Sequence, residues 1–317
     1  MKVIDHIKQS KKTLFSIEIL PPLKGKGIQS IFDTIDPLME FKPPFIDVTY
    51  HREEYVYKKR DGGYLEKVSI RKRPGTVSIC SAIKSKYNTE AVPHLICGGF
   101  TKEETENALI ELNFLGIDNV LALRGDAIKT ENAFIPTPGG HQFALDLVKQ
   151  ISGLNNGHYL DEDLLGHANT DFCIGIAGYP EKHFEAPNPQ TDLMHLKQKV
   201  EAGAHYIVTQ MFFDNTKFVA FTEACRKMNI DIPIIPGLKI LTSKKQLINL
   251  AKTFHIDIPE DLTQAVMNCK NDEDVKQVGI EWCINQSKEL IKENVPCLHY
   301  YTMGNPDITL KVAREVF

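Results

Sequence analysis

An acidic residue stands inside an apolar segment near the start of the chain. The run LFSIEIL (residues 14–20) has the composition of a buried strand and is stopped by two prolines, yet it carries Glu18. Burying a carboxylate is costly unless the group is paired or protonated. Two interpretations therefore carry equal weight. Glu18 forms an ion pair with a Lys or Arg, or burial raises its pKa so that it donates a proton near neutral pH.

Polar residues also follow two later apolar runs. LALRGDA places Arg124, Gly125 and Asp126 after a strand, where glycine permits close approach of a ligand. A helix cap is the plainer interpretation of Asp126. In IVTQMFFD, Gln210 stands beside aromatic residues, where an amide can bind both the donor and the acceptor edge of a heterocycle, or can be satisfied by the backbone.

Other catalytic chemistries find little support. Tyr179 and His183 occur in AGYPEKHFEA, but a lone histidine is more often a surface or helix-cap residue than a ligand. The chain has no H-E-x-x-H spacing and no nucleophile elbow, so no metal site and no serine-hydrolase site is expected.

The elements that must position these residues alternate along the chain. Helix-length amphipathic segments are expected at 101–116, 191–203, 217–229 and 271–294. Eight apolar runs are expected to be strands: 14–20, 45–50, 92–97, 119–124, 172–178, 205–213, 233–238 and 297–303.

This alternation predicts an α/β fold, a parallel (β/α)8 TIM barrel. The rival, a doubly wound sheet, would need a glycine-rich phosphate loop, and neither G-x-G-x-x-G nor G-x-x-x-x-G-K-[ST] occurs. In a barrel the outer strand face is apolar, so Glu18 should point into the lumen near the catalytic end. Long insertions are expected after the second strand (51 to about 80) and before the fifth (152–171).

Composition limits the partners and the cellular compartment that we expect for this protein. The 317 residues are 42% hydrophobic and 25% charged with a formal charge of -4, so neither nucleic acid nor a membrane is an expected partner. No transmembrane span or signal peptide is expected. Seven cysteines without a C-x-x-C pair indicate a reduced, cytoplasmic protein, and those in VSIC, HLIC and DFCIGIAG are expected to lie in apolar strands.

Motifs along nearly the whole chain resemble those of the 5,10-methylenetetrahydrofolate reductases, flavin-dependent barrel enzymes of one-carbon metabolism. They occur in the family's order: FSIEILPP, DVTY, PHLIC, ALRGD, AGYPExHxEA, DLxxLKxKVxAGA, TQMFFD, IIPGL and HYYTM. Several motifs in register are far more specific than one. The resemblance implies a single catalytic barrel domain over residues 1–317, without the regulatory domain of the larger eukaryotic enzymes.

The resemblance also implies a reaction. NADH or NADPH delivers hydride to FAD, and 5,10-methylenetetrahydrofolate then takes it to become 5-methyltetrahydrofolate, which serves methionine biosynthesis. The folate ring must open to an iminium ion before it accepts hydride, so an acid is needed. Glu18 matches the family's proton donor. Asp126 matches the acidic residue beside the flavin, and Gln210 the amide that binds the pterin ring. A homo-oligomer is left open.

The remaining site residues are implied by the resemblance alone. They match positions that hold FAD: Thr49, His94, Arg124, Gly125, Asp126, Phe143, Tyr179, His183, Ala186, Asp192 and Lys199.

The chain also departs from the family pattern. Lys244 stands where an aromatic residue often contacts the stacked substrate, and Asn305 where an arginine can engage the folate tail. Basic triplets at 58–60 and 71–73 could attract a polyglutamate tail, although a solvated hairpin is the plainer interpretation. Two alternatives stay open: a reductase subunit fed by a ferredoxin-type partner, and a non-catalytic folate- or flavin-binding barrel.

Overall fold

The computed structural model describes residues 1–71, 73–128, 131 and 133–317, with the side chains of residues 70 and 71 left out. Parallel strands form one sheet in the order β10-β11-β1-β2-β5-β6-β7-β8-β9. Its strands are β1 (Leu14–Ile19), β2 (Phe45–Val48), β5 (Glu90–Ile96), β6 (Asn119–Leu123), β7 (Cys173–Gly178), β8 (Tyr206–Thr209), β9 (Ile234–Ile235), β10 (Gly237–Leu238) and β11 (Cys297–Tyr301).

The sheet curls into a nearly closed barrel. Its two edge strands, β9 and β10, are separated only by Pro236, so they are two halves of one strand and the barrel has eight positions. Pro236 has no N–H to donate, which interrupts the ladder, but its carbonyl accepts a hydrogen bond from the His299 N–H at 3.1 Å. The predicted (β/α)8 barrel is confirmed.

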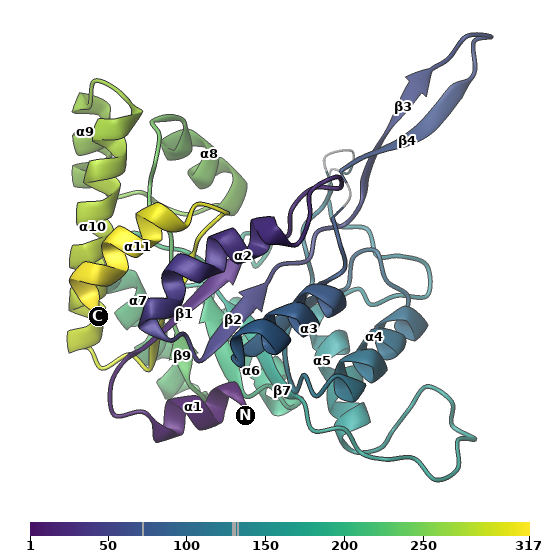
Figure 1. Ribbon diagram of the computed structural model, residues 1–317. Coiled ribbons are helices and arrows are strands. Elements are labelled where there is room, and N and C mark those ends of the chain that lie inside the picture. Colours follow the sequence, from purple (N-terminus) through teal and green to yellow (C-terminus); the bar gives the residue numbers. More distant parts are fainter. Residues whose placement is uncertain (72, 129–130, 132) are drawn as a thin grey trace.

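Helices surround the barrel (Figure 1). They are α1 (Val3–Gln9), α2 (Gln29–Ile35), the 3-10 helix η1 (Asp36–Phe41), α3 (Thr76–Tyr87), α4 (Lys102–Phe114), α5 (Ala144–Asn155), α6 (Pro189–Glu201), α7 (Asn215–Lys227), α8 (Lys245–Phe254), α9 (Glu260–Asn268), α10 (Asp272–Lys292) and α11 (Pro306–Val316).

The four helices predicted from periodicity are found within a few residues of their expected bounds, and their first residues explain where they begin. Thr101 and Glu104 form a capping box at α4, and the side chains of Asn188, Asp214 and Asn271 accept backbone N–H groups at the starts of α6, α7 and α10.

Alternating side chains separate the barrel's two cores. Phe15, Ile17 and Ile19 belong to the outer core that packs against the helices. The lumen holds a smaller cluster that includes Phe45 and Tyr206. Val3 of α1 belongs to this cluster, and its N–H donates to Asn119 Oδ1 at 2.8 Å, so α1 closes the end of the lumen opposite the strands' carboxyl ends.

The insertion after β2 forms an antiparallel hairpin, β3 (Glu54–Lys59) and β4 (Leu65–Arg71). It projects away from the barrel (Figure 1), and we call residues 54–71 the arm. Its tip is exposed: Tyr57, Tyr64 and Leu65 are each more than 60% accessible to solvent. A solvated hairpin is the plainer interpretation of the basic triplets in this insertion, and the structure shows such a hairpin.

Two details differ from the sequence prediction. The VSIC segment is helical, because it lies within α3 and buries Ile79 and Cys80 as one face of that helix. The expected strand over 205–213 ends at Thr209, after which Met211 and Phe213 turn outward into a cluster with α8, α9 and α10. All seven cysteines are free. In the described part of the chain, no helix is long and apolar enough to cross a membrane.

Candidate active site at the barrel mouth

Glu18 lies near the carboxyl end of β1, where parallel pairing sets its neighbours. It is in register with Asp47 of β2 and with Tyr301 of β11, and all three side chains share the lumen face. The Glu18 side chain is 14% exposed, whereas that of Asp47 is fully buried. The predicted placement of Glu18 in the lumen, near the carboxyl ends of the strands, is confirmed.

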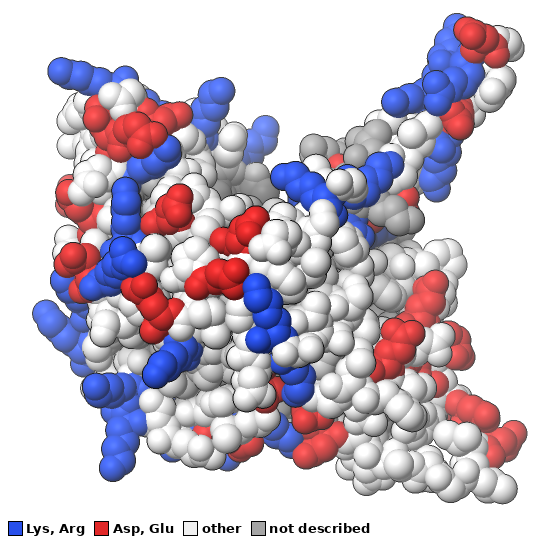
Figure 2. Space-filling view, viewed as in Figure 1, with Lys and Arg blue, Asp and Glu red and all other residues white. Residues whose placement is uncertain are grey.

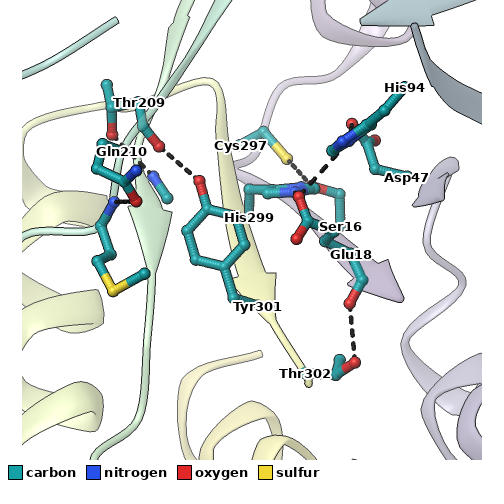
Figure 3. Close-up of polar contacts among 12 residues, drawn as sticks. Ser16, Glu18, Asp47, His94, Thr209, Gln210, Cys297, His299, Tyr301 and Thr302 are labelled. Atoms are coloured by element: carbon teal, nitrogen blue, oxygen red, sulfur yellow. Dashed lines mark hydrogen bonds and ion pairs between the residues drawn. The ribbon is translucent and has the colours of Figure 1, made fainter. Parts of the chain in front are cut away.

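The Glu18 carboxyl belongs to a polar cluster in the lumen (Figure 3). His94 Nε2 lies 3.5 Å from Glu18 Oε2 and 3.4 Å from Asp47 Oδ2. His299 Nε2 is 4.0 Å from Glu18 Oε2, and its Nδ1 lies 2.8 Å from the Ser16 hydroxyl. Among the described residues, no group of His, Cys, Asp or Glu is arranged to hold a metal ion.

Burial is the main reason that the pKa of Glu18 is raised, to about 7. His94 and Lys239 act in the opposite direction, while the Asp47 carboxylate raises the pKa further. Within the described residues, no Lys or Arg nitrogen forms an ion pair with Glu18. A pKa of about 7 lets the carboxyl hold a proton near neutral pH, which is the condition for a general acid.

Gln210 lies on the other side of the mouth, directly after β8. Its Oε1 accepts the Met211 N–H at 2.9 Å, and its side chain lines a small pocket with Tyr179 and His255. Beside it, the Tyr301 hydroxyl donates to the Thr209 carbonyl at 2.6 Å (Figure 3). This bond ties β11 to β8 past the β9–β10 strand that lies between them, and it fixes the wall between Glu18 and Gln210.

Several residues implied to hold FAD gather where β6 and β7 end. Arg124 pairs with Glu185, and the Tyr179 and His183 rings meet edge to face with centroids 4.7 Å apart. The His183 N–H donates to Asp192 Oδ2 at 3.0 Å.

A cation lies behind these residues on α6. Lys199 Nζ donates to the Ala177 carbonyl at 3.1 Å. Burial lowers the pKa of this ammonium to about 8, against the opposing pull of Asp192. A partly buried cation beside polar loop groups suits a phosphate-bearing ligand.

The other implied FAD positions are more scattered. His94 joins the Glu18 cluster rather than the β6–β7 group, and Phe143 is 52% exposed at the start of α5. Ala186 is buried, and its carbonyl accepts a hydrogen bond from Lys182 Nζ at 2.6 Å.

Two features of the mouth fit a flavin nucleotide. The Thr49 hydroxyl oxygen is buried without a hydrogen-bond partner among the described residues, so it is available to a ligand. Gly125 has φ +83°, a conformation that side-chain-bearing residues rarely adopt, and it turns the chain so that Asp126 is exposed after β6.

Sequence reasoning missed several members of the lumen cluster: Asp47, Lys239, His299 and Tyr301. Asp47 gives the clearest signal that could have been used, because FIDV puts a carboxylate in an apolar strand just as FSIEI does. Lys239 follows β10 and is 8% exposed; burial lowers its pKa to about 8, although the Glu18 carboxylate raises it.

The two departures from the family pattern have local partners. Lys244 Nζ donates to the Met267 carbonyl at 2.9 Å, which ties the start of α8 to α9. The Asn305 N–H donates to the Thr302 carbonyl at 3.0 Å in the turn that leads into α11.

Comparison with known proteins gives a consistent result. The family model for methylenetetrahydrofolate reductase matches residues 2–316. The chain is 34% identical to methylenetetrahydrofolate reductase (NADH) 1 of Arabidopsis thaliana, across 96% of this chain and 49% of the relative. The chain thus spans about half the length of that relative. It is 30% identical to 5,10-methylenetetrahydrofolate reductase of Salmonella typhimurium, across 95% of this chain and 90% of the relative.

A solved structure shares the fold. It is a Clostridium thermocellum protein that binds two copies of 5-methyl-5,6,7,8-tetrahydrofolic acid, with a TM-score of 0.56 and 14% identity across 99% of this chain and 98% of that chain. The family model and the bacterial relative together decide the assignment, and the motifs quoted above lie in the same region. The chain belongs to the methylenetetrahydrofolate reductase family.

Proposed function

We propose that this protein reduces 5,10-methylenetetrahydrofolate to 5-methyltetrahydrofolate with electrons from NADH or NADPH, using FAD as its cofactor and Glu18 as proton donor. The observation that carries the proposal is the Glu18 carboxyl, mostly buried at the barrel mouth with a pKa raised to about 7, in a chain of this family. A donor on a rigid strand can be held close to the folate ring that must open.

Each residue at the mouth has a separate role in the proposed reaction. Glu18 would protonate the folate so that its ring opens, and Gln210 would bind the pterin edge. Arg124, Tyr179 and Lys199, with the other positions named above, would hold FAD. FAD held there would supply the hydride-transfer chemistry between the nicotinamide and the folate. Asp126, exposed after β6, would place a negative charge beside the flavin.

The comparisons support a folate substrate, but they do not decide between NADH and NADPH as the electron donor. The structural neighbour binds 5-methyltetrahydrofolate, the product of the proposed reaction. Relatives are named for NADH and for NADPH. We therefore propose a reduced nicotinamide without choosing between the two, and a cytoplasmic enzyme of methionine biosynthesis.

An anaerobic titration tests the proposal. The purified chain is loaded with FAD, its spectrum is recorded, and NADH, NADPH and methylenetetrahydrofolate are added in turn. Bleaching by a nicotinamide followed by recovery with the folate is expected.

Other outcomes of the titration contradict the proposal. Recovery seen only after chemical reduction of the flavin would favour an enzyme fed by a ferredoxin-type partner. Failure to bind FAD, or binding without either half-reaction, would favour a non-catalytic barrel.

A further inference from the structure

The Asp47 carboxyl is the most enclosed charged group of the lumen cluster. Its side chain has no solvent exposure, and neither carboxylate oxygen has a hydrogen-bond partner among the described residues. His94 Nε2 lies 3.4 Å from Asp47 Oδ2, and that nitrogen also lacks a hydrogen-bond partner among the described residues. Leaving a buried carboxylate and a neighbouring imidazole unpaired is costly, so a proton belongs between them.

The same nitrogen faces a second carboxyl. His94 Nε2 is 3.5 Å from Glu18 Oε2, so one imidazole atom stands between two carboxyl groups on adjacent strands. Two buried carboxyl groups that are in register on adjacent strands and face the same imidazole nitrogen favour holding one proton in common, as in other carboxylate pairs of active sites. Only Glu18 of the pair is partly exposed, at 14%.

We propose that Asp47, with His94 between, shares one proton with Glu18 and that the Asp47 negative charge drives this proton onto Glu18. Asp47 is then a positioning residue for the proton donor. This inference rests on the proposed function. In each turnover the Glu18 O–H bond breaks as the proton passes to the folate, and the resulting carboxylate takes its next proton from solvent at the mouth.

Most other ionisable groups near the pair are neutral at pH 7, so the Asp47 charge is the main negative charge acting on Glu18. Burial lowers the pKa values of both His94 and His299, so the two imidazoles are neutral near pH 7. Tyr206 of β8 and Tyr301 of β11 have raised pKa values and stay neutral, as do Cys80 of α3 and Cys297 of β11. Lys239 is the opposing charge, because it lowers the pKa of Glu18.

The test uses the isosteric variant Asp47→Asn in the full chain without cofactor or substrate. Carboxyl 13C NMR of glutamate-labelled protein follows Glu18, whose signal is identified by its loss in Glu18→Gln. The Glu18 midpoint is expected to fall from about 7 by roughly one pH unit, the effect of removing a nearby like charge. An unchanged midpoint would overturn the inference.

Kinetics in the FAD-loaded protein give the second measurement. Asp47→Asn should move the alkaline loss of the folate half-reaction to lower pH, with a rate about tenfold lower above the midpoint and recovery in acid. The nicotinamide half-reaction should be unchanged. A shifted midpoint without a shifted rate profile would also overturn the role in proton donation.

Two controls keep the test decisive. Tyr206→Phe removes a buried lumen hydroxyl without changing charge, and it should move neither midpoint nor rate profile. If Asp47→Asn does not fold, Asp47→Ser serves instead, because it also removes the charge. The Glu18 midpoint should again fall from about 7, and an unchanged midpoint would refute the coupling. These titrations need no flavin, so they stand even if the proposed function fails.

Discussion

At the residue scale, the chemistry of Glu18 comes from where its carboxyl lies. An exposed glutamate would be ionised at neutral pH and could not donate a proton. Burial in the lumen raises its pKa to about 7, and 14% exposure of the side chain still leaves it accessible from the mouth. The surrounding histidines contribute hydrogen-bonding capacity without adding charge, because their pKa values are lowered by burial.

Replacing the acid should separate the two half-reactions. Glu18→Gln is expected to leave flavin reduction by the nicotinamide intact and to slow the folate half-reaction by about a hundredfold or more, because the amide cannot donate the required proton. Stopped-flow absorbance of each half-reaction measures this. The control Glu106→Gln alters a buried glutamate of α4 and should leave both rates unchanged. Equal loss of both half-reactions would mean that Glu18 is structural.

The raised pKa of Glu18 also predicts how stability depends on pH. The folded state binds the proton more tightly than the unfolded chain, since the pKa rises from 4.5 to about 7. This contribution is fully present below pH 4.5 and is lost as pH rises through 7. The Tm of Glu18→Gln relative to the unmodified protein should therefore increase by several degrees between about pH 5 and about pH 8. Parallel Tm curves would contradict this.

At the element scale, the barrel positions the site through strand register and close backbone approach. Glu18, Asp47 and His94 come from three successive strands of the sheet, and alternation turns all three inward. Gly237 marks where β10 must pass close to its neighbours. A Cβ there would lie 2.3 Å from both the Thr209 carbonyl oxygen and the Tyr301 hydroxyl.

Gly237→Ala should therefore destabilise the barrel near the site. The added methyl group would displace the Tyr301 hydroxyl from the Thr209 carbonyl, at a cost of about 1–3 kcal/mol for overpacking. Denaturant unfolding followed by circular dichroism measures the loss. Gly27→Ala is the matched control, because a Cβ at Gly27 meets nothing within 4 Å. Equal stability of both variants would show that the neighbours can move apart.

At the scale of the whole molecule, charge is unevenly distributed. Residues 51–76 contain eight Lys and Arg against four Asp and Glu, although the chain as a whole carries a formal charge of -4. Figure 2 shows the Lys and Arg side chains along the arm. The first basic triplet, 58–60, lies at the exposed end of β3, and its Arg60 pairs with Glu66 across the hairpin at 2.5 Å. In the second triplet, Lys72 lies outside the described residues.

Neutralising the arm tests whether it attracts a folate tail. Changing Lys58, Lys59 and Arg60 to Gln should raise the KM for polyglutamylated methylenetetrahydrofolate more than for the monoglutamate, and added salt should shrink the difference. Steady-state kinetics with both substrates measures it. The control changes Lys8, Lys11 and Lys12 near α1, at the opposite end of the barrel. Equal effects on both substrates would leave the arm as a solvated hairpin.

The sequence by itself predicted the barrel, most of its strands, four of the surrounding helices and the inward direction of Glu18. These follow from local rules, since periodicity of two or of 3.6 residues is set by which faces are buried. The same rules failed at VSIC, where a short apolar run does not distinguish a strand from a buried helix face. The same rules predicted too long a strand at 205–213. The strand ends at Thr209, because Met211 and Phe213 pack into a separate cluster.

Only the tertiary structure decided which polar side chains meet. Glu18, Asp47, His94 and His299 are separated by up to hundreds of residues, and their distances depend on the register of parallel strands, which no local pattern contains. The same holds for the pKa of Glu18, because desolvation and the charges of Asp47 and Lys239 act through space. The sequence determines where a carboxylate is buried, whereas the fold determines which groups surround it and whether it holds a proton.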